Sequence, residues 1–169
     1  TGWGDELLLG MIMTIMVSTS SLAFGLVIGT LFASFKLSNS FILRAIAEFY
    51  TTVVRGVPEL LVIYLLFFGG GSAVMYIAKI FGYMGYIELS PFTIGTIAVG
   101  AISGAYSTEV IRGAILAVPK GQFEAAKTLG MKKSIMSLKI IFPQVARLAL
   151  PGIGNVWQVT LKDTALISV

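Results

Sequence analysis

The stretch that decides the fold covers residues 119–154, PKGQFEAAKTLGMKKSIMSLKIIFPQVARLALPGIG, and it interrupts an otherwise apolar chain. Pro119 cannot continue a preceding helix but suits the first turn of a new one, whereas Gly130 is a typical helix stop. We therefore expect a short helix of about three turns between them. Glu124 stands near its start, where the helix dipole favours a carboxylate, and two alanines follow.

The same stretch is strongly basic. Against the single acid Glu124 it holds six cations, Lys120, Lys127, Lys132, Lys133, Lys139 and Arg147. A basic loop between hydrophobic segments belongs on the cytoplasmic side of a membrane. The residues alone leave two interpretations open: a smooth surface that another protein approaches, or a membrane-surface helix whose alanines pack locally.

The composition indicates that the solvent of this chain is a bilayer. Of its 169 residues, 56% are hydrophobic and 12% are charged, and the mean hydropathy is +0.91. A soluble domain has about 25% charged residues. The net charge is +4, but the cations form no stripe interleaved with aromatic side chains, which argues against nucleic-acid binding.

The chain also lacks the residue types that most enzymes use. It has no Cys and no His, which excludes thiol chemistry and removes the commonest general base and metal ligand. Residues 130–134 lack the glycine spacing of a phosphate-binding loop. We therefore expect no catalytic residue, no metal and no cofactor, and any ATP hydrolysis would belong to another chain.

Hydropathy predicts an all-α membrane protein. Apolar segments cover residues 7–35, about 41–68, 92–117 and about 148–161, and a further one begins at residue 164 and is cut at 169. These predict a bundle of about five transmembrane helices with the last one truncated. We expect residues 1–169 to form a single transmembrane domain, as a fragment of a longer chain.

Prolines and glycines add detail to these spans. Pro58 should kink or break the second helix, and the glycines of Gly69–Ser72 should end it. Residues 73–90 then read as a mixed apolar connection. The small-residue spacings Gly25-x-x-x-Gly29 and Gly100-x-x-x-Gly104 either permit close helix approach or reflect the tolerance of membrane helices for glycine.

The distribution of charge predicts the orientation. Lys36 and Arg44 flank the first loop, and six further cations lie in the 119–154 stretch, whereas the opposite side holds Asp5, Glu6, Lys79 and Glu88. The N-terminus is therefore expected outside the cell.

Ionisable residues inside the spans are functional candidates, because a charge in a bilayer is costly. Helical spacing offers each one a partner: Arg44 with Glu48, Arg55 with Glu59, and Glu109 with Arg112. For Arg55, Glu109 and Arg112, a gate and a structural ion pair both stay open. Glu59 adjoins the predicted break at Pro58, where freed backbone groups line a cavity or meet another helix, so it is a candidate for the substrate cavity.

Asp163 is a further candidate for that cavity, together with its neighbours Trp157 and Gln158. It lies where one apolar run ends and the next begins. A carboxylate in a partly dry cavity attracts an ammonium or guanidinium strongly. The alternative is a salt bridge to Lys162 at a helix end.

Several strings in the chain resemble the permease subunits of ABC importers. They are Glu-Ala-Ala at 124–126 followed, after three intervening residues, by Gly130, then YTTVVRGVP at 50–58, GAYSTE at 104–109, ALPGIGN at 149–155, WQV at 157–159 and KDTAL at 162–166. Over nearly its whole length the chain is similar to the polar amino-acid branch, particularly the Q-type subunit of histidine/lysine/arginine/ornithine and opine importers.

The resemblance implies a function, a location and a set of partners. The chain would be the transmembrane permease subunit of an ATP-driven importer for polar, chiefly basic, amino acids or opines, working by alternating access in the bacterial inner membrane. ABC ATPase subunits, a related or identical second permease chain, an external solute-binding protein and membrane lipid are the implied partners. The implied ATPase-coupling residues are Gly121, Glu124, Ala125, Ala126 and Gly130.

Two other classes of membrane protein would also account for part of this sequence. A stand-alone channel or secondary carrier would use the intramembrane charges, but it leaves the loop around Glu124 unexplained. A purely structural membrane subunit leaves Glu59 and Asp163 unexplained.

Overall fold

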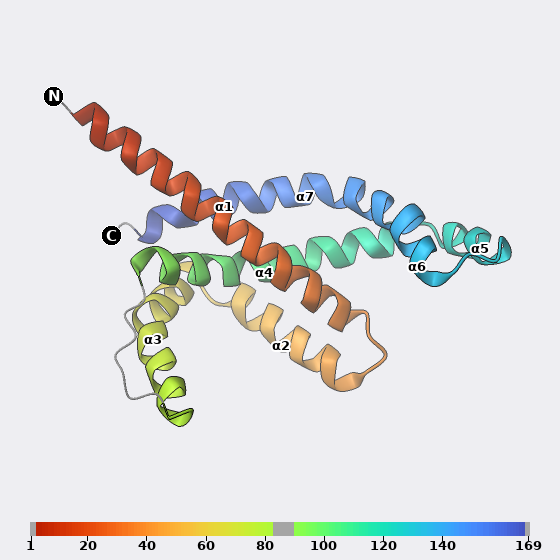
Figure 1. Cartoon of the computed structure of the whole chain (residues 1–169), viewed down its shortest axis with the longest axis horizontal. Helices are drawn as coiled ribbons and strands as arrows, with labels where there is room; N and C mark the ends of the chain where they lie inside the picture. The colour runs from red at the N-terminus through yellow and green to blue at the C-terminus, as the bar shows by residue number, and fades with distance from the viewer. Residues whose placement is uncertain (1–2, 83–89, 168–169) are drawn as a thin grey trace.

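The computed structural model describes residues 3–82 and 90–167, and nearly all of these residues are helical (Figure 1). In chain order the helices are α1 (Trp3–Lys36), α2 (Phe41–Gly56), α3 (Glu59–Ile80), α4 (Pro91–Ala117), α5 (Lys120–Thr128), α6 (Lys133–Met136) and α7 (Phe142–Asp163). A π-helical turn, Ser137–Ile141, joins α6 to α7, and a 3-10 turn, Thr164–Ile167, follows α7. The predicted all-α class is confirmed.

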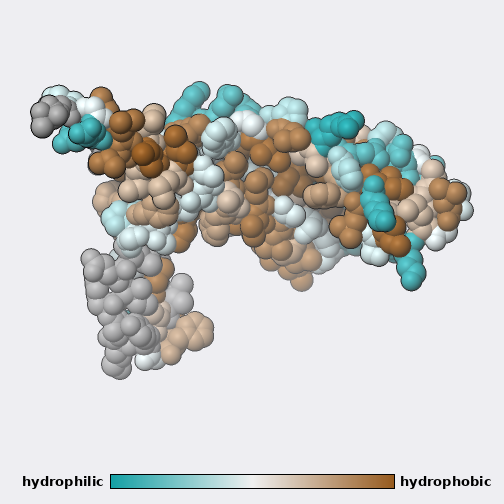
Figure 2. All heavy atoms as spheres, turned by 45° about the horizontal axis from the view of Figure 1, so that its top comes forward, coloured by the Kyte–Doolittle hydropathy of each residue, from teal (hydrophilic) through white to brown (hydrophobic). Residues whose placement is uncertain are grey.

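Three of the described helices, α1, α3 and α4, are long and apolar enough to cross a membrane. The 34 residues of α1 extend over about 50 Å, which exceeds the hydrocarbon thickness of about 30 Å, so α1 tilts or reaches beyond the hydrocarbon. Hydrophobic residues cover much of the middle of the molecule, and hydrophilic residues gather toward the end that carries α5 and α6 (Figure 2).

α1, α2, α4 and α7 run back and forth between two ends of the molecule, whereas α3 points away from them at one end (Figure 1). At one end lie α5, α6, the turn from α1 to α2, the end of α4 and the start of α7. At the other end lie the start of α1, the break between α2 and α3, the start of α4 and the end of α7. The most extensive contact between helices is that of α1 with α4, which cross at the centre.

Glycine and serine make this crossing close. A Cβ atom added to Gly29 would lie 2.6 Å from the Cβ of Ser107, and one added to Gly25 would lie 2.8 Å from the Cβ of Ser103. A Cβ on Gly104 would likewise lie 2.9 Å from a side-chain carbon of Ile28. The helix faces that carry the two glycine spacings therefore pack against each other, and close helix approach is the correct interpretation of both.

The predicted second span is two helices rather than one. α2 ends at Gly56, Val57 is extended, and α3 begins at Glu59, so Pro58 breaks the helix. The expectation that Gly69–Ser72 ends the span is wrong, because α3 continues to Ile80. Each glycine costs only about 1 kcal/mol relative to alanine, and a continuous helix satisfies its own backbone where water is absent.

The expected connection over residues 73–90 is therefore helical in its first part. Residues 73–80 belong to α3, and the remainder up to residue 82 forms a turn. The part of this expectation that falls on residues 83–89, including Glu88, lies outside the described residues.

The apolar run 148–161 is short for a span unless residues near 140–145 join it, and in the structure they do. α7 begins at Phe142, and Pro143, which lacks an N–H, lies just after the π-helical turn Ser137–Ile141. Pro151 lies inside the helix. Beside it, a Cβ added to Gly152 would lie 2.7 Å from a methyl carbon of Val110, so α7 also packs closely on α4.

The α1–α4 crossing generates a test of stability. We expect Gly29→Val to lower the stability of the folded subunit by about 1–3 kcal/mol, because the added methyl groups overlap Ser107. Gly10→Val is the matched control in the same helix, since no atom lies within 4 Å of a Cβ added there. The measurement is the fraction of monodisperse complex left after heating in detergent, and equal losses for both variants would contradict the expectation.

Candidate functional site

The break between α2 and α3 positions two charged residues. Arg55 occupies the last turn of α2, and Glu59 occupies the first turn of α3. The helix dipole favours a carboxylate at the start of a helix, which suits Glu59. The predicted Arg55–Glu59 ion pair is absent from the salt bridges among the described residues, because both side chains turn to α4 instead.

On α4, Tyr106 contacts both of these side chains. Its hydroxyl donates a hydrogen bond of 2.7 Å to Oε1 of Glu59. The guanidinium carbon of Arg55 lies 5.4 Å from the centre of the Tyr106 ring, a cation–π distance. One aromatic residue thus holds a cation on its face and an acid at its hydroxyl.

Asp163, in the last turn of α7, completes this cluster. Only 4% of the residue is exposed, and its carboxyl group lies close enough to that of Glu59 to interact with it directly. The alternative salt bridge to Lys162 is not present in the described part of the chain, and Lys162 itself is exposed. We call Glu59, Tyr106 and Asp163 the acid cluster.

Two carboxylates placed together, as in the acid cluster, leave their negative charge unbalanced. Two like charges that share one sheltered site repel each other unless a proton or a cation lies between them. Arg55 is close to the cluster but directs a terminal nitrogen toward Glu109, at 4.0 Å. The arrangement can therefore bind a mobile cation between Glu59 and Asp163. In the described residues, no group of three or more His, Cys, Asp and Glu side chains could hold a metal.

Trp157 and Gln158 do not join the acid cluster. Both residues are exposed, whereas Asp163 faces inward with Val156 and Thr160 of the same helix. Gln158 instead lies on a polar stripe of α7 with Asn155 and Lys162, three and four residues away, all exposed. Of the four residues predicted for the substrate cavity, the structure brings together only Glu59 and Asp163.

A second charged group, the Lys36 network, joins α1, α2 and α4. The ammonium of Lys36 lies 2.5 Å from Oε1 of Glu109 and 2.8 Å from Oε2 of Glu48, and 7% of the Lys36 side chain is exposed. Arg112 binds the other oxygen of Glu109 at 3.1 Å, and Arg55 approaches Oε1. Glu109 is thus surrounded by three cations from three helices.

This network corrects one predicted pair and confirms another. Glu48 binds Lys36 rather than Arg44, because Lys36 reaches it from the neighbouring helix at 2.8 Å. The predicted pairing of Glu109 with Arg112 is present. Arg55 connects the two charged groups, since it lies against Tyr106 of the acid cluster and near Glu109 of the Lys36 network.

Within the basic stretch 119–154, residues 120–128 form α5, with Pro119 at the N-cap position and Gly130 after the end of the helix. Gly130 has a φ of +67°, the left-handed conformation that glycine adopts without strain. Gly121, Glu124 and Ala125 are exposed, whereas Ala126 is buried. Ala126 packs in a cluster with three residues from both sides of the loop, Val118, Met136 and Ile141.

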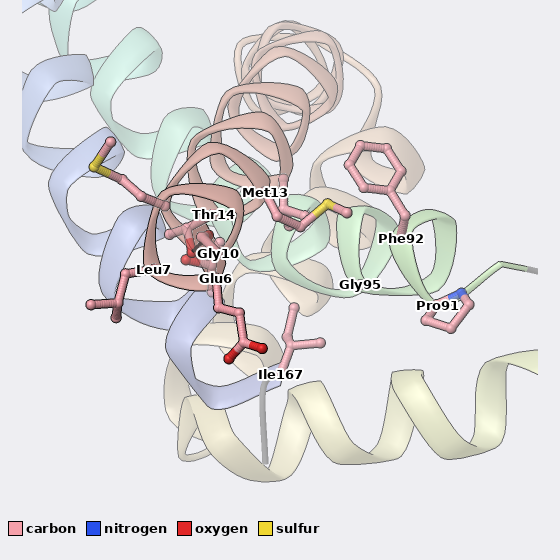
Figure 3. A pocket seen from close by; sticks show the side chains of 12 residues that line it. Glu6, Leu7, Gly10, Met13, Thr14, Pro91, Phe92, Gly95 and Ile167 are labelled. Atoms are coloured by element: carbon pink, nitrogen blue, oxygen red, sulfur yellow. Dashed lines mark hydrogen bonds between the residues drawn. The ribbon is translucent and has the colours of Figure 1, made fainter. Parts of the chain in front are cut away.

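An apolar pocket of about 520 Å³ lies at the opposite end (Figure 3). The first half of α1, the start of α4 and the turn after α7 line it, with Met13, Phe92 and Ile167 among its walls. Apart from Glu6, no charged residue lines it. It contains none of the predicted site residues and lacks the groups that bind an amino acid's two charges.

Two residues of the charged groups were missed by sequence reasoning. Lys36 was assigned only to a loop, although a single cation at the end of a long apolar helix is a candidate partner for an intramembrane acid. Tyr106 lies three residues before Glu109, on the same face of α4, and this spacing was the available signal.

Together, these features define a class. A helical chain with three helices able to cross a membrane, an exposed polar stripe on α7 and a sheltered pair of carboxyl groups has the features of a membrane protein with an internal polar site. Residues 21–169 match the family described as "Binding-protein-dependent transport system inner membrane component", and the chain belongs to that family. It is therefore a permease subunit of ABC importers, and a transport component rather than a catalytic one.

Known members of the family are similar over almost the whole chain. The nopaline transport system permease protein NocQ of Agrobacterium fabrum is 57% identical over 169 residues, which cover 99% of this chain and 72% of NocQ. The octopine transport system permease protein OccQ of Rhizobium radiobacter is 49% identical, over 99% of this chain and 71% of OccQ. The histidine/lysine/arginine/ornithine permease protein HisQ of Escherichia coli is 42% identical, over 99% and 73%.

A solved structure has the same fold. It is described as the crystal structure of an amino acid ABC transporter with histidines, and it superposes with a TM-score of 0.73 at 30% identity. The match covers 99% of this chain and 76% of the solved chain.

Proposed function

We propose that this permease subunit carries a basic amino acid or an opine, and that the substrate's cation passes between Glu59 and Asp163. The observation that carries the proposal is the approach of these two carboxyl groups in a sheltered position. A guanidinium or ammonium between them would relieve their repulsion and gain charge-assisted hydrogen bonds. The names of the related permeases, for nopaline, octopine and basic amino acids, support the same substrate class.

The polar stripe of α7 supports a partnership with a second permease chain. Asn155, Gln158 and Lys162 are exposed on one side of a helix that belongs to a membrane protein. Polar side chains in a membrane face a water-filled path or another protein rather than lipid. We propose that this stripe lines the translocation path between this chain and a related or identical permease, with Trp157 and Gln158 along the path.

The position of α5 supports a coupling role. α5 lies between α4, which carries Tyr106, and α7, which carries Asp163. Ala126 packs in the buried cluster with Val118, which directly follows α4, and with Met136 and Ile141, which lie in α6 and in the π-helical turn that leads into α7. A push on the exposed residues of α5 would therefore move α4 and α7 together and change the access to the acid cluster. We propose that a separate ABC ATPase subunit delivers this push at Gly121, Glu124, Ala125 and Gly130, and that an external solute-binding protein delivers the substrate.

The family places the chain among inner membrane components. We propose that the N-terminus lies outside the cytoplasm, with α5 inside, because the residues in and around α5 and α6 carry many of the cations and the N-terminus lies at the opposite end of the molecule (Figure 1). Residues 1–169 would then form a single transmembrane permease domain. The alternative of a stand-alone channel or secondary carrier does not fit a member of this family.

The coupling role makes a testable prediction. We expect Glu124→Lys to leave the subunit in the membrane but to reduce uptake by more than tenfold, because it reverses the charge of an exposed residue in the middle of α5, the helix that docks on the ATPase. Uptake and ATPase co-purification are the measurements. Asp5→Lys, a reversal in the first turn of α1, is the control and should transport normally. Normal transport by Glu124→Lys would remove α5 from the mechanism.

The orientation can be tested by labelling, since the chain has no Cys. A cysteine placed at Ser134 should react with an impermeant thiol reagent only from the cytoplasmic side, and one placed at Gly4, at the start of α1, only from outside. Both positions are exposed. The reverse pattern would invert the proposed topology.

The substrate proposal predicts a charge-selective loss. We expect Asp163→Asn to weaken the apparent affinity for arginine by about tenfold or more, because it removes one charge-assisted hydrogen bond. Glutamine, which has no side-chain cation, should lose less. The measurement is substrate-stimulated ATPase activity of the reconstituted complex, in a setting that does not need the binding protein.

The exposed acid Asp5 supplies the control for this experiment, as Asp5→Asn should change neither substrate. Equal losses for arginine and glutamine in Asp163→Asn would assign Asp163 a structural role and leave the substrate's charge unexplained.

A further inference from the structure

A polar cavity of about 560 Å³ lies between the end of α1, the length of α2 from Phe41 to Arg55 and the second half of α4. It is separate from the acid cluster and from the apolar pocket of Figure 3. The residues that line it are Lys36, Phe41, Arg44, Ala45, Glu48, Arg55, Glu109 and Arg112.

The charges around this cavity do not balance. Four cations face two carboxylates, and both carboxylates already bind Lys36. Arg112 shares Glu109, and Arg55 reaches it only at 4.0 Å. Among the described residues Arg44 has no ion pair, and it is exposed. An excess of positive charge in a membrane protein is costly unless an anion or water accompanies it.

The start of α2 adds to this positive field. Phe41, the first residue of α2, is part of the cavity wall. The N-cap residue Ser40 makes no side-chain hydrogen bond to the first N–H groups of the helix. Uncapped N–H groups and the positive end of the helix dipole favour an anion at this point. Charged side chains and helix geometry therefore point independently to a negatively charged ligand.

An apolar surface adjoins the cavity on the same helix. Exposed apolar side chains recur on α2 at helical spacing: Ile42, Ile46, Phe49 and Val53. Phe41 and Ala45, which line the cavity, lie beside this stripe on the helix. A ligand that fits both features has an anionic head for the cavity and a hydrocarbon tail for the stripe.

We propose that this cavity binds the phosphate headgroup of an anionic phospholipid, with its acyl chains along the α2 stripe. The depth agrees at one end of the cavity: Lys36 ends a helix longer than the hydrocarbon thickness, so Lys36 and the neighbouring Phe41 and Arg44 lie near headgroup level. Arg44 and Arg112 bind the phosphate oxygens, while Lys36 holds the two carboxylates away from it. The site does not depend on the identity of the transported substrate.

The test uses the complete purified transporter that contains this subunit. Native mass spectrometry measures retention of phosphatidylglycerol and of phosphatidylcholine with the same acyl chains. We expect the wild-type complex to retain phosphatidylglycerol in preference. Arg44→Gln should lower that retention about tenfold, the effect of one charge-assisted hydrogen bond. Because Arg44 has no ion pair, its removal leaves no carboxylate exposed, and Arg44→Lys should keep most of the binding.

Lys79→Gln removes one exposed cation from the end of α3 and should change nothing. A further arm adds inorganic phosphate to the detergent-solubilised complex. Displacement of the lipid by millimolar phosphate would mean a soluble-anion site and would overturn the lipid assignment. Equal phosphatidylglycerol retention by wild type and Arg44→Gln would overturn the site. Dissociation of the permease pair by Arg44→Gln, with lipid retention unchanged, would assign the cavity to a subunit interface and reject the proposal as well.

Discussion

The close crossing of α1 and α4 is the contact on which the other arrangements depend. In a bilayer no hydrophobic effect drives one apolar helix onto another, so association rests on packing and on buried polar contacts. Gly25 and Gly29 let the backbone of α4 approach at van der Waals distance, with Ser103 and Ser107 facing them. Because the two helices then lie so near each other, Lys36 at the end of α1 reaches Glu109 on α4.

Once α4 is fixed at the centre, the charged residues of the other helices assemble around it. The break at Pro58 turns the chain so that Arg55 and Glu59 approach Tyr106 from two different helices. α7 packs on the same helix through Gly152 and brings Asp163 to Glu59. Around Glu109 the ionisable groups of α1, α2 and α4 meet neighbours of opposite charge, as burial in a membrane requires. The pairing of two carboxyl groups in the acid cluster departs from this pattern, and an unbalanced site of this kind is suited to a cationic ligand.

The same helix connects the two ends of the molecule. α4 carries Tyr106 near its middle and leads directly into α5 at its end. The small cluster around Ala126 ties α5 to the turn before α7, so α5 does not hang free on a flexible loop. A rigid connection is a physical requirement for a lever, since a push on a loosely attached helix would be absorbed by the loop.

The sequence by itself determined the features that depend on local chemistry. The apolar runs predicted the helices, Pro58 predicted the break, and Pro119 with Gly130 bounded α5, because proline lacks an N–H and glycine tolerates a positive φ. The positively charged loop and the sequence motifs of the permease family could also be recognised from the sequence alone.

Only the tertiary structure decided which helices meet. Sequence spacing offers each charge a partner on its own helix, at three or four residues, and for Glu48 and Arg55 that partner was wrong. The true partners come from other helices, through distances that depend on how closely the backbones pack. Asp163 faces Glu59 across some hundred residues for the same reason. The two glycine spacings were readable one by one, but their mutual contact, which sets all these distances, is a property of the folded chain.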